Sequence, residues 1–113
     1  MNDCLFCKII NRDIPSTTIY ENEYVYAFAD IEPQAPFHAI IVPKTHISSA
    51  DEINAENSHY IAKIFEAVAA IARQENLENG YRVVNNCGED GLQTVKHLHF
   101  HLMGGRKFAW PAG

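Results

Sequence analysis

The segment His97-Leu98-His99-Phe100-His101-Leu102 alternates imidazole and large apolar side chains without interruption. Successive side chains of an extended strand point to opposite faces, so the histidines would share one face and the apolar residues the other. On a helix the middle histidine would be rotated about 200° from its neighbours, and no face would be shared. The pattern therefore predicts a strand, Thr94 to Met103, with a buried apolar face and an imidazole face that is available for chemistry.

The bulk properties fit one compact domain, residues 1–113, because 47 % of the 113 residues are apolar and no shift of composition marks a linker. No apolar run approaches the roughly 18 residues of a membrane helix, and the polar N-terminus is typical of an unsecreted protein. A net charge of -5, with only nine lysines and arginines, argues against non-specific nucleic-acid binding. We therefore expect no stable nucleic-acid or membrane partner, whereas a small anionic ligand remains open.

Local patterns place the other elements along the chain. Apolar spacing predicts a short helix over residues 4–12 and a long helix from Ala55 to about Asn76, with Asn54 as its cap. The S-x-x-E sequence Ser49 to Glu52 has the form of a capping box and predicts a helical turn. Strand composition and turn residues predict further strands at 17–20, 24–29, 38–42 and 81–85, with a loop at 86–93. Together these elements predict an α+β domain with an antiparallel sheet of about five strands, one long helix and one or two short helices.

The predicted histidine strand suits attack on phosphorus. Imidazole has an ordinary pKa of about 6.5, so it is mostly neutral near pH 7 and yet readily protonated. His99, in the middle, is best placed as the nucleophile, and His101 lies about 6.6 Å further along an extended strand, where it can contact phosphate oxygens or a leaving group. Imidazoles on one strand can also share a metal ion, and the strand alone does not separate the two interpretations.

A second motif, Cys4-x-x-Cys7, brings metal chemistry into the argument. Two thiolates and two imidazoles complete a tetrahedral zinc shell, and His46 and His97 are the candidates for the imidazoles. The alternative is two thiols packed in a helix without a metal. Three cysteines in 113 residues do not form the even, dense framework of a secreted disulfide protein, so a cytoplasmic location is expected.

Taken together, the motifs resemble the histidine triad (HIT) nucleotide-binding proteins, whose mark is His-x-His-x-His followed by an apolar residue. The resemblance runs nearly end to end, through residues 5–10, 27–36, 42–48 and 97–106. The ending Gly104-Gly105-Arg106, with Trp110-Pro111, is similar to the phosphoramidase branch of the family. His101 stands where the uridylyltransferase branch has Gln.

The resemblance implies a HIT-like fold and a purine nucleoside 5'-phosphoramidase. In that reaction His99 attacks the α-phosphorus of an AMP-amine conjugate, the amine is expelled, and water hydrolyses the nucleotidyl-histidine to AMP. The chemistry requires no cofactor, so zinc would be a structural element. Gln93, Thr94 and His101 are placed by sequence to stabilise the charge that develops on the phosphate oxygens.

Further roles also come from the resemblance. His38 and Asn86 match positions that orient the histidines or relay protons, and Asp30 matches the residue that accepts hydrogen bonds from the ribose. Trp110 belongs to the expected substrate-binding set, or covers a neighbouring subunit. The expected base pocket is apolar and comprises Leu5, Phe6, Ile9, Ile14, Phe28 and Ile31, some of which periodicity alone would assign to the core.

Two departures from the family pattern bear on the site. Leu92 stands where many members have glycine, so the loop before Gln93 is expected to be strained or altered. Ala29 replaces a histidine that some members carry beside the ribose aspartate, which would loosen selection of the base or the ribose.

The resemblance further implies a homodimer in which the long helix and the strand 81–85 meet across a two-fold axis. Two other functions remain open beside the phosphoramidase. One is an AMP-binding regulatory module with little turnover, and the other is a dinucleoside polyphosphate hydrolase with the same nucleophile.

Overall fold

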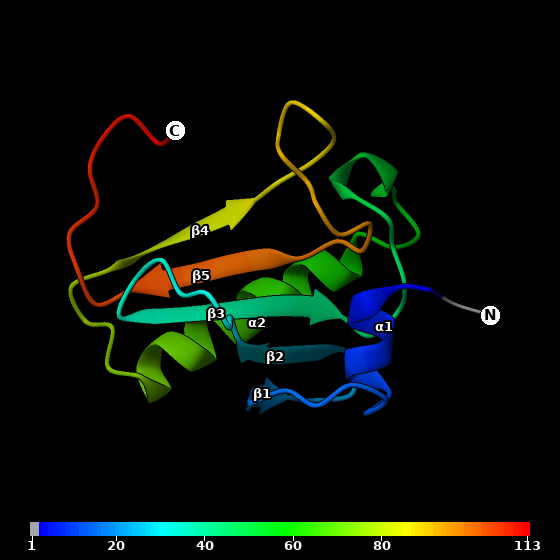
Figure 1. The fold of residues 1–113 in the computed structure, drawn as a ribbon, viewed down its shortest axis with the longest axis horizontal. Coiled ribbons are helices and arrows are strands. Elements are labelled where there is room, and N and C mark those ends of the chain that lie inside the picture. Colours follow the sequence, from blue (N-terminus) through cyan, green and yellow to red (C-terminus); the bar gives the residue numbers. More distant parts are fainter. Residues whose placement is uncertain (1–2) are drawn as a thin grey trace.

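A computed structural model describes residues 3–113, so the first two residues of the expected domain lie outside the described part of the chain. In chain order the elements are α1 (Leu5–Ile10), β1 (Thr18–Glu21), β2 (Val25–Ala29), β3 (Phe37–Pro43), the 3-10 helix η1 (Ala50–Glu52), α2 (His59–Gln74), β4 (Tyr81–Asn85) and β5 (Phe100–Gly104). The strands form one antiparallel sheet of order β1-β2-β3-β5-β4 (Figure 1). The predicted α+β class and the five-stranded antiparallel sheet are confirmed. Over residues 3–113, every helix is too short or too polar to cross a membrane.

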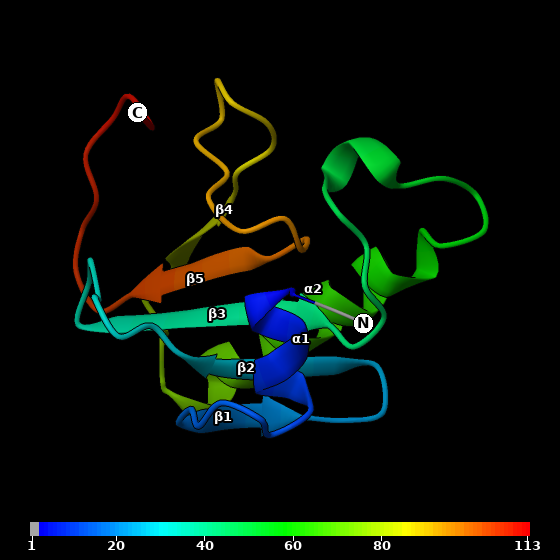
Figure 2. The same cartoon turned by 45° about the vertical axis from the view of Figure 1, so that its right-hand side comes forward.

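The two helices lie on opposite faces of the sheet, with α1 in front of β2 and β3 and α2 behind them (Figure 2). Strand β2 shows how the sequence achieves this. Val25 and Ala27 belong to the core under α2, whereas Tyr26 and Phe28 belong to a second core under α1. Because side chains alternate along a strand, a run of buried apolar residues serves both faces.

Helix α2 is shorter than predicted at its N-terminal end. Ile64, Val68 and Ile71 are buried on its core face, as their spacing indicated. The side chain of Asn54, however, accepts hydrogen bonds from the N–H groups of Glu56 and Asn57, at 2.9 and 3.2 Å. This closes a separate turn, so the prediction that Asn54 caps the long helix was wrong and the helix begins at His59.

Two short elements also differ from their predictions. The predicted helical turn after Ser49 is present as one 3-10 turn, but the Ser49 side chain makes no capping hydrogen bond, so the expected capping box is absent. Helix α1 ends at Ile10, short of the predicted residue 12, and Arg12 has a φ of +69° that cannot continue a right-handed helix. At its start the thiol of Cys4 accepts a hydrogen bond from the Cys7 N–H.

The histidine strand is the most consequential correction, because β5 begins only at Phe100, whereas we predicted a strand from Thr94. On one side β4 ends at Asn85, which pairs with Phe100. On the other side Phe100 pairs with Ile41 of β3, and the last two residues of β3 have no partner in β5. The Leu98 N–H instead donates to the carbonyl of Ile47 at 2.6 Å. The predicted sorting of side chains still holds, since Leu98 and Leu102 are fully buried in the α2 core.

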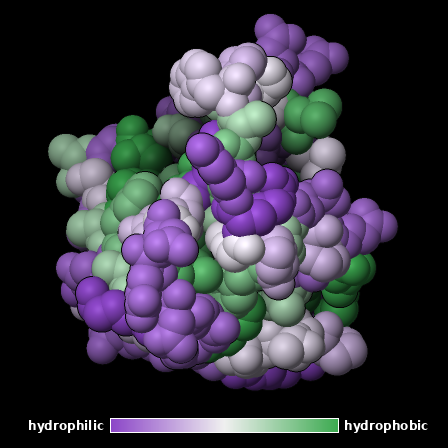
Figure 3. All heavy atoms as spheres, turned by 90° about the vertical axis from the view of Figure 1, so that its left-hand side faces the viewer, coloured by the Kyte–Doolittle hydropathy of each residue, from purple (hydrophilic) through white to green (hydrophobic). Residues whose placement is uncertain are grey.

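At the far end of the sheet β5 leads into the C-terminal segment (Figure 1), and this side of the molecule carries hydrophilic side chains with smaller apolar patches between them (Figure 3). The guanidinium groups of Arg82 and Arg106 lie 5.0 and 4.2 Å from the Phe108 ring, and Arg82 also donates to the Ala109 carbonyl. A hollow of about 660 Å³ lies here, and no histidine or cysteine lines it. Trp110 is 83 % exposed. The chemistry-bearing residues are therefore elsewhere.

Candidate active site and metal centre

The α1 face of the sheet carries a pocket of about 780 Å³. Its walls come from α1, the segment that follows it, the C-terminal end of β2, single residues of β3 and β5, and the loop before β5. The sequence-predicted residues that line it are Leu5, Phe6, Ile9, Ile14, Phe28, Asp30, Ile31, Asn86, Thr94, His99 and His101. His38 lies behind this wall, while Gln93 and Trp110 are outside the lining. Ser16, Thr17, Leu92 and Val95 line it as well and were not predicted to.

One end of the pocket is an apolar slot. The rings of Phe6 and Phe28 meet edge to face with their centroids 5.5 Å apart, and both side chains are buried. Ile9 is buried beside them, whereas Ile31 is 95 % exposed and lies at the rim. Such a slot accepts a flat apolar or aromatic group between its walls.

His99 lies beside this slot, against Phe6, with its tautomer fixed by its surroundings. Its Nδ1 lies 2.7 Å from the carbonyl oxygen of His97, and because a carbonyl can only accept, Nδ1 carries the proton. The lone pair is therefore on Nε2. Burial lowers the pKa of His99, which keeps the ring neutral near pH 7, and the Phe6 ring packs against it at 4.9 Å. This is the state that a nucleophilic imidazole requires.

His101, His38 and Asp30 form a relay beside it. The N–H of Gln34 donates to His38 Nδ1 at 3.0 Å, so the neutral His38 ring carries its proton on Nε2. That proton points at His101 Nδ1, 2.9 Å away, with the Asp30 carboxylate at 3.3 Å. His101 is thereby left with its own proton on Nε2. Burial lowers the pKa of His101 to about 4, while the Asp30 charge opposes the shift.

The ligand atoms of Asp30, His38 and His101 also lie within 4.8 Å of one another, close enough to suggest a metal site. The tautomer argues against it. A metal ion needs a lone pair on the ring nitrogen that faces it, but the Gln34 N–H already uses the only lone pair of neutral His38. These groups are therefore a hydrogen-bond relay.

The loop before β5 is braced by two predicted residues. Asn86 Nδ2 donates to the Gly91 carbonyl at 2.7 Å. The Gln93 side chain accepts from the Gly88 N–H at 3.1 Å and donates to the Ser48 carbonyl at 2.8 Å, so it supports the loop from outside the pocket. Leu92 adopts a φ of +64° and is 76 % exposed, in line with the strain expected where many members have glycine.

The sequence analysis assigns no role to Asn85, the last residue of the strand predicted at 81–85. Its Nδ2 donates to the His99 carbonyl at 2.9 Å. The only signal in the sequence was that Asn85 ends a predicted strand, which does not specify a partner 14 residues away.

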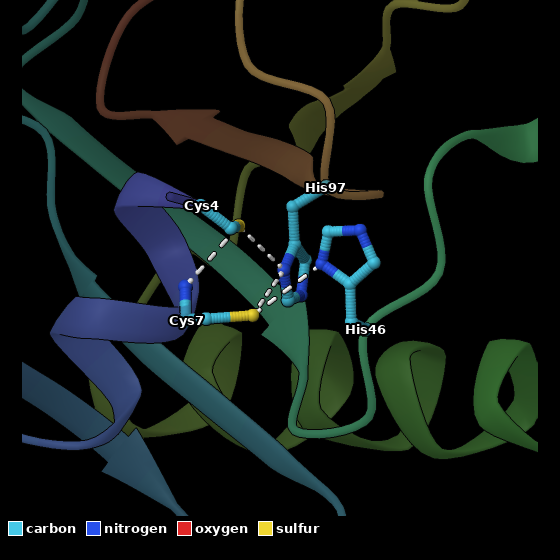
Figure 4. Close-up of side chains that lie close together, drawn as sticks. All are labelled: Cys4, Cys7, His46 and His97. Atoms are coloured by element: carbon cyan, nitrogen blue, oxygen red, sulfur yellow. Dashed lines mark hydrogen bonds between the residues drawn. The ribbon is translucent and has the colours of Figure 1, made fainter. Parts of the chain in front are cut away.

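The second motif assembles as predicted: Cys4, Cys7, His46 and His97 converge between α1 and the loops before η1 and β5 (Figure 4). His97 Nδ1 lies 3.3 Å from Cys4 Sγ and 3.5 Å from Cys7 Sγ, and Cys7 Sγ lies 3.3 Å from His46 Nδ1. Tetrahedral zinc would separate its sulfur and nitrogen ligands by about 3.6 Å.

His97 is held as a metal ligand should be. Its Nε2–H donates to the Pro43 carbonyl at 3.0 Å, which leaves the Nδ1 lone pair for an ion. Its side chain is fully buried, and burial lowers its pKa to about 4, so the ring is neutral. The donor set and spacing fit zinc.

Known proteins carry the same arrangement of sequence and fold. The family model described as HIT domain matches residues 11–108. The chain is 48 % identical to the 14 kDa zinc-binding protein of Zea mays, over 96 % of this chain and 87 % of that protein. It is 42 % identical to the purine nucleoside phosphoramidase of Escherichia coli K12, over 92 % and 88 %. A crystal structure of a HIT family hydrolase from Legionella pneumophila superposes with a TM-score of 0.95 at 45 % identity, over 98 % and 100 %. The triad, the pocket and these matches together establish that this chain belongs to the HIT domain family.

Proposed function

We propose that the protein is a purine nucleoside 5'-phosphoramidase that hydrolyses AMP-amine conjugates through a nucleotidyl-histidine intermediate. The observation that carries the proposal is the fixed tautomer of His99, whose Nε2 lone pair stands in a pocket that ends in an apolar slot. The relative from Escherichia coli bears the name of that activity. The base would lie in the slot, with the Asp30 carboxylate accepting hydrogen bonds from the ribose.

Two displacements at phosphorus make up the reaction. The His99 Nε2 lone pair forms a bond to the α-phosphorus as the P–N bond breaks, and the amine leaves after taking up a proton. Water then attacks the same phosphorus, the P–Nε2 bond breaks, and AMP is released. Because burial keeps His101 neutral, it would donate its Nε2–H to the substrate as a hydrogen bond, while the proton that the amine takes up from solvent is returned by the attacking water in the second step. Thr94 and the loop amides would hold the phosphate oxygens.

The test is turnover of a fluorogenic adenosine phosphoramidate. His99→Ala should lower kcat by about a thousandfold or more while AMP still binds. The matched control is His59→Ala, because His59 is an exposed histidine outside the residues that line the pocket. Rapid quench and peptide mass mapping should find the adenylyl group on His99. Undiminished turnover by His99→Ala would refute the proposal, and faster turnover of diadenosine polyphosphates by the natural protein would move the assignment to that hydrolase.

We also propose that Cys4, Cys7, His46 and His97 hold one structural zinc ion. Bound there, zinc would cross-link the start of α1 to two loops and leave His99 and His101 for catalysis. Protein purified without added metal should contain one zinc per chain. Cys7→Ser should lose it and unfold at a lower temperature, whereas Cys87→Ser, a cysteine outside this cluster, should keep both metal and stability. Cysteines stay reduced in the cytosol, so a pair of zinc-bound thiolates is consistent with a cytoplasmic location.

A homodimer through α2 and β4 completes the proposal. Strand β4 is at the edge of the sheet, and a sheet edge offers unpaired backbone groups to a second copy. Tyr81 of β4 and Phe65 of α2 are 43 % and 46 % exposed, which is high for large apolar side chains. Trp110 of one copy would then be free to reach the pocket of the other. Sedimentation at micromolar concentration should give twice the chain mass, and Phe65→Glu should give the chain mass.

A further inference from the structure

The nucleophile of the proposed reaction sits where the sheet stops. The register pairs Asn85, the last residue of β4, with Phe100, the first residue of β5. One step further the ladder would pair the next residue of each strand, Asn86 and His99. The chain leaves the sheet at Asn86, so the His99 carbonyl has lost the backbone neighbour that a continued ladder would give it.

Asn85 replaces that neighbour with its side chain. Its carboxamide Nδ2 donates to the His99 carbonyl at 2.9 Å, in a part-buried position. The bond fixes the peptide plane between His99 and Phe100, and therefore the direction in which the His99 side chain leaves the backbone. The ring is then oriented by the Nδ1–H bond to the His97 carbonyl, at 2.7 Å, and by the edge of Phe6.

We infer that Asn85 is a positioning residue for the nucleophile, which holds the His99 backbone so that Nε2 faces the phosphorus. The inference rests on the proposed function for its kinetic consequence only. Asn85 is absent from the residues that line the pocket, so it acts through His99 and should not alter nucleotide binding. Loss of alignment in such a constellation costs about 10- to 100-fold in rate.

The test compares Asn85→Val, which suits a strand and removes the donor, with Gln74→Met. Gln74 Nε2 also donates to a backbone carbonyl, that of Ile19 at 3.2 Å, but on the other face of the sheet, so it is a matched control. In Asn85→Val the rate of adenylyl transfer to His99 in a single turnover should fall about 10- to 100-fold, with AMP affinity within twofold of the natural protein. Gln74→Met should leave both unchanged.

A nuclear magnetic resonance measurement separates this inference from the proposed function. The His99 Nδ1–H should give a slowly exchanging resonance in the natural protein, and Asn85→Val should broaden or lose it whether or not the protein turns over. If Asn85→Val does not fold, Asn85→Asp, which has the same shape without the donor, takes its place. Natural protein that is inactive on phosphoramidates refutes the proposed function only. A folded Asn85 variant with unchanged resonance and transfer rate, or one that loses AMP affinity in proportion to rate, overturns the inference.

Discussion

Replacing Leu92 by glycine should stabilise this protein, although it removes four carbon atoms from the chain. Leu92 has a φ of +64°, a conformation that costs a residue with a Cβ about 1–2 kcal/mol. The side chain is 76 % exposed, so little burial is lost with it. Glycine loses about 0.5–1 kcal/mol through its greater freedom in the unfolded chain. The difference leaves a net stabilisation of about 0.5–1 kcal/mol, or about 2–5 °C in Tm for a chain of this size.

Urea unfolding followed by far-ultraviolet circular dichroism, at one fixed metal content, measures the effect. Leu92→Ala is the control, since it removes the exposed atoms beyond Cβ but keeps the Cβ and the strained φ. It should not stabilise the protein. Gly88→Ala makes the opposite change, because it adds a Cβ at a positive φ. Gly88 has a φ of +73° and an added Cβ would meet no atom within 4 Å, so its cost, about 1 kcal/mol, is purely conformational. Equal stabilisation by Leu92→Gly and Leu92→Ala would refute the reasoning.

Other predictions concern pH and the loop. In the metal-free protein His97 and His101 have pKa values near 4, so the folded state binds fewer protons than the unfolded chain, where the pKa is about 6.5. The free energy of unfolding should therefore fall as pH drops from about 6.5 to 4, by up to about 3 kcal/mol per histidine. Urea unfolding curves whose midpoint stays constant over this pH range would contradict the prediction. Because the pKa of His99 is lowered, the acid limb of kcat/KM should lie below pH 6.5, and a limb above that value would show a different ionising group. Gly91→Ala should destabilise the protein by about 1–3 kcal/mol, because its Cβ would clash with the Cys87 carbonyl oxygen. Calorimetry that finds no change would show that the loop backbone shifts to accept it.

Where apolar residues recur at a regular short spacing, the sequence predicted correctly which side chains face the core. The alternation from His97 to Leu102 sorted imidazoles from core residues because the two faces of an extended chain follow from the backbone alone. The spacing of Ile64, Val68 and Ile71 identified the core face of α2 for the same reason. Ends of elements were less predictable. Asn54 looks like a helix cap in the sequence, and only its two hydrogen bonds to the next turn revealed that the helix starts later.

The sequence by itself determined the fold class and which side chains share a face, since residue type and local spacing suffice for these. The roles expected for Asp30, His38 and Asn86 came from the family resemblance. The tertiary structure decided where β5 begins, because Phe100 is the first residue that pairs with both neighbours, Asn85 of β4 and Ile41 of β3. It also decided the protonation of the site. Which nitrogen of His99 carries the proton depends on a carbonyl aimed at Nδ1, and the state of His38 depends on one N–H from a neighbouring turn. Such hydrogen bonds require particular atoms to meet within about 3 Å, and only the folded chain brings them together.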